Sequence, residues 1–127
     1  MSGIFVVIGA RRGLGLEVVR RLAESSSEEV KEIRAVCRPC NNITNELKEP
    51  SDARIKLVQI DGCKAESLRE SQVLAGAEAV FFCASASSTL KNYKVVDEEG
   101  PKVVAEAAFE AQVPKMVTLA RSPSSTL

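Results

Sequence analysis

The stretch IFVVIGARRGLGLEVVRRL, residues 4–22, decides the fold of this chain. It joins five apolar residues to a glycine-rich segment and then to a helical apolar pattern, which predicts a strand, a tight turn and an amphipathic helix. In such a turn Gly9 leaves the strand, Gly13 lets backbone amides approach a pyrophosphate, and Gly15 lets the helix pack closely on the strand. The phosphates would lie at the positive end of the helix dipole. The alternative is an ordinary strand-to-helix turn that holds no ligand.

Composition and charge exclude several classes of function. The 127 residues include 17 basic and 17 acidic side chains, so the formal net charge is zero and we expect no nucleic-acid partner. The apolar runs are too short to span a bilayer, and no secretory leader precedes the first strand, so we expect a cytoplasmic location without a membrane span. The absence of histidine excludes Ser-His-Asp and Cys-His catalysis, and we expect no metal site.

Further apolar segments alternate with helical patterns along the rest of the chain. Strands are predicted at residues 33–37, 54–60, 79–84 and 115–120, and helices at 65–74 and 95–111, with Gly76 breaking the first of these helices. Residues 41–49 could hold one short helix that stops before Pro50. This alternation predicts an α/β fold, a Rossmann-like doubly wound parallel sheet of about five strands in the order 3-2-1-4-5. A ligand crevice is expected at the C-terminal ends of strands 1, 2 and 4. Residues 1–120 would form this domain and residues 121–127 a flexible tail.

Motifs along nearly the whole chain resemble the short-chain dehydrogenase/reductase superfamily, most closely its atypical NAD(P)-binding branch with NmrA-like members. They are the glycine spacing of residues 9–15, the acidic position in residues 60–62, the fourth-strand segment 77–85, the helix segment 96–108 and the fifth-strand segment 113–119. The resemblance implies a bound dinucleotide, with the acidic residue contacting the adenine. The candidate cofactor-binding residues are Gly9, Arg11, Arg12, Gly13, Leu14, Gly15, Arg38, Asp61, Gly62, Cys83, Ala84 and Ser85.

The catalytic residues of that superfamily do not carry over. Its enzymes use a Tyr-x-x-x-Lys pair and a serine just past the fifth strand. Tyr93 is the only tyrosine here, and Asp97 rather than lysine stands four positions later. Alanine and arginine occupy positions 120 and 121, where the serine is usual, although Ser122 follows. We therefore expect a member that lacks the C-terminal part, and we assign no catalytic residue; Ser85 or Ser122 could help to orient a carbonyl.

Two arginines favour NADP over NAD. Members that bind NAD need an acid after the second strand to accept a hydrogen bond from the ribose 2′-hydroxyl. This chain has Arg38 there, and Arg12 precedes Gly13. A guanidinium can bind a 2′-phosphate bidentately, whereas an acid would repel it. The alternative for Arg38 is a solvated loop charge.

Cys37 and Cys40 form a Cys-x-x-Cys pattern after the second strand. It is either a redox pair or the coincidence of a strand residue and a loop residue. Three functions therefore stay open: the NAD(P)-binding domain of an oxidoreductase, a non-enzymatic dinucleotide-sensing or protein-interaction module, and a thiol redox protein that uses Cys37 and Cys40. The fifth strand would be an exposed edge that a protein partner or a homodimer could cover.

Overall fold

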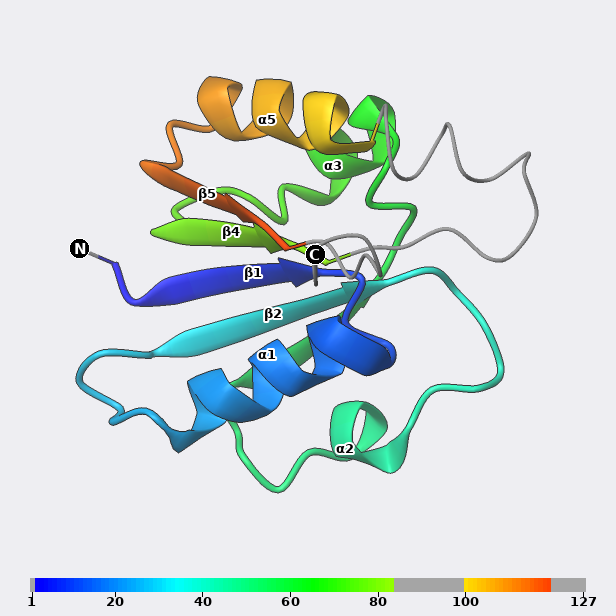
Figure 1. Cartoon of the computed structure of the whole chain (residues 1–127), viewed down its shortest axis with the longest axis vertical. Helices are drawn as coiled ribbons and strands as arrows, with labels where there is room; N and C mark the ends of the chain where they lie inside the picture. The colour runs from blue at the N-terminus through cyan, green and yellow to red at the C-terminus, as the bar shows by residue number, and fades with distance from the viewer. Residues whose placement is uncertain (1, 84–99, 120–127) are drawn as a thin grey trace, which may run out of the picture.

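A five-stranded parallel sheet forms the centre of the computed structural model, which describes residues 2–83 and 100–119 (Figure 1). The strand order is β3-β2-β1-β4-β5, and every neighbouring pair is parallel. The predicted fold class and strand order are therefore confirmed. The strands are β1 (Ile4–Ile8), β2 (Glu32–Cys37), β3 (Ile55–Gln59), β4 (Ala79–Phe82) and β5 (Lys115–Thr118).

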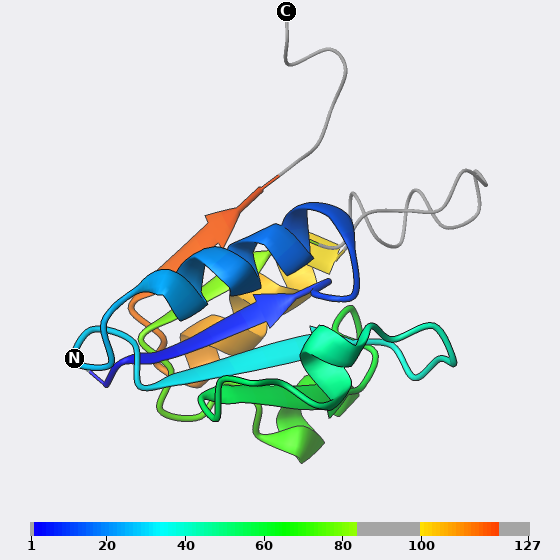
Figure 2. The same cartoon turned by 90° about the horizontal axis from the view of Figure 1, so that it is seen from below.

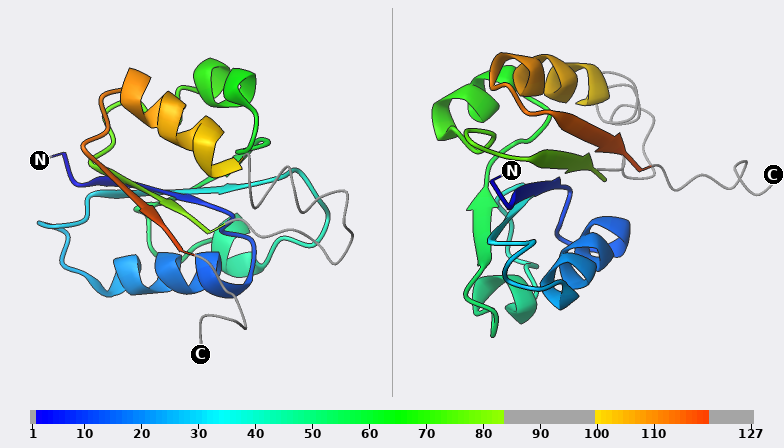
Figure 3. Two further views of the ribbon diagram at one scale, coloured as in Figure 1. Left: turned by 45° about the horizontal axis from the view of Figure 1, so that its top comes forward. Right: turned by 90° about the vertical axis from the view of Figure 1, so that its left-hand side faces the viewer.

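Helices cover both faces of the sheet. α1 (Gly13–Glu24) and α2 (Asn45–Lys48) lie on one face, and α3 (Ala65–Ser71) and α5 (Gly100–Glu110) lie on the other (Figure 3). Figure 2 shows α1 in front of the sheet, running along the direction of the strands. None of these described helices is long and apolar enough to cross a membrane.

The hydrophobic core has two halves, one on each side of the sheet. Val6 and Val80 pack toward α3 and α5, whereas Val7 and Ile33 pack toward α1 and α2, and all four are fully buried. A parallel sheet that is covered on both faces buries successive residues of its central strands, which is why β1 reads as a continuous apolar run. β5 is more open, since Val117 keeps 36% of its surface exposed.

The helix predicted at residues 65–74 is shorter than expected. α3 ends at Ser71 because Gln72 adopts a left-handed conformation (φ 54°) and its amide donates to the Arg69 carbonyl. This turn lets Val73 and Leu74 enter the core instead of continuing the helix. Gly76 (φ 72°) is the last residue of the turn that begins at Gln72, so it does not itself end the helix. Four parts of the prediction lie outside the described residues. They are the last residue of the fourth strand (84), the start of the last helix (95–99), the last residue of the fifth strand (120) and the tail (121–127).

Arg54 was predicted to begin the third strand but lies just before it. Its guanidinium donates to the carbonyls of Ala23 (2.7 Å), Ser25 (3.0 Å) and Val30 (2.9 Å) and pairs with Asp52 (2.7 Å). These carbonyls belong to the end of α1 and the loop that follows it. Arg54 therefore attaches the α1–β2 connection to the start of β3.

Candidate functional site

Four of the candidate residues follow the carboxyl ends of four adjacent strands. Gly9 follows β1, Arg38 follows β2, Asp61 lies just past β3 and Cys83 follows β4. The arrowheads of β1, β2 and β4 point to the right in Figure 1, where the turn into α1 also lies. The structure thus brings the residues to one edge of the sheet, where the strand order reverses and ligands bind in doubly wound folds. Ala84 and Ser85 lie outside the described residues.

Hydrogen bonds hold the glycine loop against the neighbouring strand. The amides of Gly9 and Ala10 both donate to the carbonyl of Val36 in β2, at 2.9 and 3.0 Å. On the other side of β1, the Cys83 amide donates to the Ile8 carbonyl at 2.8 Å. The loop is therefore positioned by sheet contacts on both sides of β1 before any ligand is considered.

The glycines of the loop serve different purposes. Gly9 and Gly13 have φ values of 87° and 61°, a region that side chains disfavour. A Cβ on Gly15 would lie 1.9 Å from the Gly9 carbonyl oxygen, so Gly15 allows α1 to approach β1. A Cβ on Gly13 would meet no atom within 4 Å. Gly13 thus faces open space, which is what an approaching phosphate requires.

The N-terminus of α1 is chemically suited to an anion. Arg12, the N-cap residue, has extended backbone and its side chain makes no capping hydrogen bond. The first turn contains no acidic residue. The first amides of a helix have no acceptor within the helix, and they carry the positive end of its dipole. This helix end therefore keeps its donors and its positive potential, beside the open space at Gly13.

The three candidate arginines differ from the other arginines of the described chain. Within residues 2–83 and 100–119, Arg11, Arg12 and Arg38 form no ion pair. The remaining five arginines of this part are all paired with a carboxylate: Arg20, Arg21, Arg34, Arg54 and Arg69. The unpaired positive charge of the described arginines is thus concentrated at the turn after β1 and at the end of β2.

Asp61 and Gly62 have structural roles in the turn that leads to α3. The Asp61 carboxylate accepts a hydrogen bond from the Cys63 amide at 2.9 Å. A Cβ on Gly62 would lie 2.7 Å from Cγ2 of Ile8, so only glycine fits against the end of β1. The hydrogen bond explains an aspartate at position 61, and the close contact explains a glycine at position 62, without any ligand. A contact between Asp61 and adenine stays a prediction from the resemblance.

The four cysteines lie in different surroundings, and none of them is joined to another by a disulfide. Cys37 is buried, and burial raises its pKa; Cys40 raises it further, while the Arg11 charge lowers it. Burial raises the pKa of Cys83 to about 11. Cys40 is exposed. Among the described residues no group of three or more cysteine or acidic side chains is arranged to hold a metal ion.

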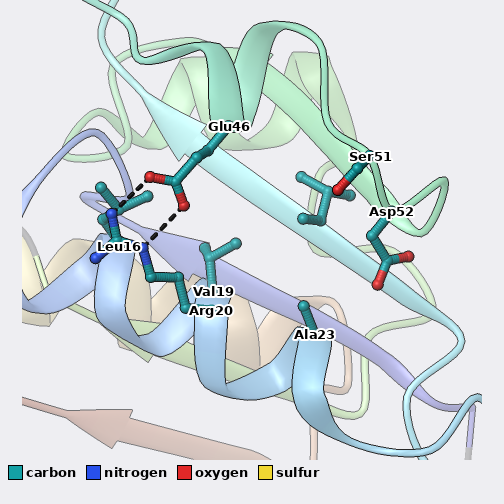
Figure 4. Close-up of a pocket in the computed structure, with 8 residues that line it drawn as sticks. Leu16, Val19, Arg20, Ala23, Glu46, Ser51 and Asp52 are labelled. Carbon is teal, nitrogen blue, oxygen red and sulfur yellow. Dashed lines mark hydrogen bonds and ion pairs between the residues drawn. The ribbon is translucent and has the colours of Figure 1, made fainter.

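A hollow of about 190 Å³ lies away from the glycine loop, between α1, α2 and the start of β3 (Figure 4). Its charged groups already have partners: the Arg20 guanidinium binds the Glu46 carboxylate at 2.6 and 2.8 Å, and Asp52 is bound by Arg54. The remaining polar side chain of the lining is the uncharged Ser51. We therefore place the candidate site at the glycine loop, where donors and positive charge are unpaired.

Gly100 has a packing role that its local sequence pattern does not predict. A Cβ on this residue would lie 2.8 Å from Cζ of Phe82 and 3.1 Å from Sγ of Cys63. Gly100 thus lets the start of α5 pack on β4 and on the turn before α3, directly behind the crevice. The Gly100–Pro101 pair is the only local signal, because proline is tolerated in the first turn of a helix.

The fold and its glycine loop define the chain as a Rossmann-type domain of the dinucleotide-binding class. A family model described as NAD(P)H-binding matches residues 9–124. The chain therefore belongs to this NAD(P)H-binding family. No curated protein sequence matches it.

Solved structures of similar fold include dehydrogenases and reductases. Pen from Bacillus thuringiensis is 18% identical with a TM-score of 0.74, and the match covers 92% of this chain and 36% of that one. Uronate dehydrogenase from Agrobacterium tumefaciens is 20% identical with a TM-score of 0.67, covering 92% and 40%. A putative short-chain dehydrogenase/reductase from Burkholderia multivorans, solved with bound NADP, is 17% identical with a TM-score of 0.71, covering 92% and 58%.

These matches confirm the resemblance to the short-chain dehydrogenase/reductase superfamily at the level of the fold. The chain spans 36 to 58% of the length of these three structures. A mutant of the Agrobacterium uronate dehydrogenase has been solved with NAD, and the Burkholderia protein with NADP. Proteins of this fold therefore use either dinucleotide, and the choice made by this chain depends on its own side chains.

Proposed function

We propose that this chain binds NADP(H), with the pyrophosphate at the N-terminus of α1. The observation that carries the proposal is the open space at Gly13 beside an uncapped helix end. Backbone amides of Gly13, Leu14 and Gly15 would donate to the phosphate oxygens, where the helix dipole favours negative charge. When bound, the cofactor supplies hydride transfer at its nicotinamide; the chain's own residues bind and orient it.

The preference for NADP over NAD rests on the unpaired arginines. Arg12 and Arg38 are exposed, and neither is paired with a carboxylate among the described residues. A 2′-phosphate at the end of β2 would bring two negative charges close to the guanidinium groups of Arg12 and Arg38. Arg11 would add to the attraction. Its charge lowers the pKa of Cys37, the last residue of β2.

The remaining candidate residues would contact the other parts of the cofactor. Asp61 and Gly62 would border the adenine, as the resemblance implies for the residues after the third strand. Cys83, Ala84 and Ser85 would run past the pyrophosphate toward the nicotinamide, as the resemblance implies for the segment after the fourth strand. Cys83 is held in place by the hydrogen bond that its backbone amide donates to the Ile8 carbonyl.

A Gly13→Val substitution tests the proposed function. Valine would fill the space that the pyrophosphate needs, so we expect NADPH and NADH binding to be lost in calorimetric titrations. Gly76→Val is the matched control, because Gly76 also has a positive φ (72°) but lies near Ile4, at the opposite end of β1. Both variants carry the same backbone strain. Retained binding in folded Gly13→Val protein, checked by circular dichroism, would contradict the proposal.

A further inference from the structure

The Cys37 and Cys40 thiols lie on either side of Arg38, at the end of β2. Cys37 is the last residue of that strand and is 5% exposed, whereas Cys40 is exposed on the loop that follows. The chain bends at Pro39 and forms no helix or strand between residues 38 and 44. The two thiols therefore sit at a bend, one anchored in the sheet and one open to reagents.

The Cys37 thiol also lies beside the glycine loop. The amides of Gly9 and Ala10, just before Arg11, donate to the carbonyl of Val36, the residue before Cys37. Burial raises the pKa of Cys37 most strongly, Cys40 raises it as well, and the Arg11 charge lowers it. The thiol pair, Arg11 and Arg38 thus occupy the same end of the crevice.

We propose that Cys37 and Cys40 form a reversible disulfide that lowers the affinity of the site for NADPH. The proposal rests on the proposed function, since it takes the end of β2 to be the 2′-phosphate end of the crevice. In the reduced chain Arg38 lies on a loop without regular structure and can orient toward a phosphate. A disulfide must bring the two Cβ atoms to about 3.8 Å, which closes a ring around Arg38 and Pro39 and restricts their backbone.

The chemistry needs a two-electron oxidant, for which a hydroperoxide is sufficient. The exposed Cys40 thiolate attacks the peroxide oxygen, becomes a sulfenic acid and releases water. The Cys37 sulfur then attacks the Cys40 sulfur, the S–O bond breaks and a second water leaves. In sum, two thiols and one hydrogen peroxide give one disulfide and two waters. A dithiol reverses the reaction by exchange.

The structure assigns different parts to the two cysteines. Cys37 is unsuited to the first attack, because it is buried and burial raises its pKa. It is suited to the second step, which occurs within the chain and needs no access for an external reagent. This arrangement differs from a thioredoxin-like pair, whose attacking thiol has a lowered pKa. The pair therefore acts on the binding site and does not make the chain a thiol oxidoreductase.

The test compares the reduced chain with the chain treated with equimolar hydrogen peroxide. Mass spectrometry should show the loss of two hydrogens, with a peptide linking Cys37 to Cys40. Calorimetry should show NADPH affinity reduced by about tenfold, as for the loss of a charge-assisted contact. NADH affinity should change less, and dithiothreitol should restore the original values. Cys40→Ser should bind NADPH but not respond to peroxide, whereas Cys63→Ser should respond like the original chain.

Several outcomes would overturn this inference. A disulfide that forms without changing NADPH affinity would refute it and leave the proposed function intact. The same holds if peroxide gives only a sulfinic acid on Cys40, or if affinity increases on oxidation. If the reduced chain binds neither dinucleotide, the proposed function and this inference both fail.

Discussion

Gly15 is the residue whose side-chain space is most restricted at the candidate site. Its missing Cβ would overlap the Gly9 carbonyl oxygen, whereas the equivalent atom on Gly13 would touch nothing. The same spacing of glycines therefore contains one position needed for packing and one that faces open space. Substitutions of Gly15 should therefore affect mainly the stability of the fold, and bulky substitutions of Gly13 mainly the binding of a ligand.

Gly15→Ala should destabilise the chain by about 3 kcal/mol, the upper end of the usual cost of overpacking, because a backbone carbonyl cannot move aside as a flexible side chain can. Gly13→Ala should cost only about 1 kcal/mol, the strain of a left-handed alanine. Urea unfolding followed by circular dichroism measures both. Similar losses for the two variants would show that α1 does not pack on β1 through Gly15.

Arg38→Ala should weaken NADPH binding by on the order of 1–3 kcal/mol, the contribution of a hydrogen bond to a charged group. NADH binding should change little, since NADH has no 2′-phosphate. Arg21→Ala is the control, because Arg21 is a well-exposed residue of α1 that pairs with Glu17. Calorimetry with both dinucleotides gives the answer. Equal losses for NADPH and NADH would exclude the 2′-phosphate assignment.

At the scale of elements, the connection between α1 and β2 depends on a residue from another part of the chain. Residues 25–31 have a serine- and glutamate-rich sequence that predicts only a loop. In the structure Arg54, whose side chain is 18% exposed, donates to three carbonyls of this connection and of the end of α1. The loop is therefore ordered by hydrogen bonds that its own sequence does not contain.

Arg54→Ala should lower the free energy of unfolding by about 2–3 kcal/mol, because three part-buried carbonyls lose a charged donor. Arg69→Ala should cost less than about 1 kcal/mol, as expected for an exposed ion pair; Arg69 pairs with Glu110 and is 60% exposed. Urea denaturation of both variants provides the comparison. A loss for Arg54→Ala no larger than that for Arg69→Ala would contradict the role assigned to Arg54.

At the scale of the whole molecule, the chain forms the layers of a dinucleotide-binding domain (Figure 3). The three solved structures compared above are longer, since the chain spans 36 to 58% of their length. The 127 residues contain no histidine and no Tyr-x-x-x-Lys pair. Cofactor binding and catalysis are therefore separate questions for this chain.

We expect the 127-residue chain alone to bind NADPH without appreciable reductase activity. Proton transfer from a positioned acid contributes about 10²–10⁴-fold to such reactions, and no side chain with that role is identified here. The measurement is NADPH oxidation with a panel of carbonyl compounds and quinones. Gly13→Val serves as the baseline, since turnover at the proposed site needs a bound cofactor. Robust turnover that is lost in Gly13→Val would show that an acid in the chain has been overlooked.

The sequence alone determined the strands, their parallel order and the place of the glycine loop. These features follow from local patterns: apolar runs predict β1 and β4, and the glycine spacing of residues 9–15 predicts a turn into α1. The end of α3 was predicted three residues too late. Its stop depends on Gln72 adopting a left-handed turn that brings Val73 and Leu74 into the core.

Only the tertiary structure decided which charges are free and which glycines are confined. Arg34 donates to the carbonyl of Val73, 39 positions away, whereas Arg38 has no such partner among the described residues. Gly62 is confined by a side chain of β1, and Gly100 by Phe82 and Cys63. These contacts join residues that are far apart in the sequence, so their existence depends on how the layers pack. Local patterns carry no information on that packing. For this reason the sequence could locate the glycine loop but not say which of the nearby arginines are free of ion pairs.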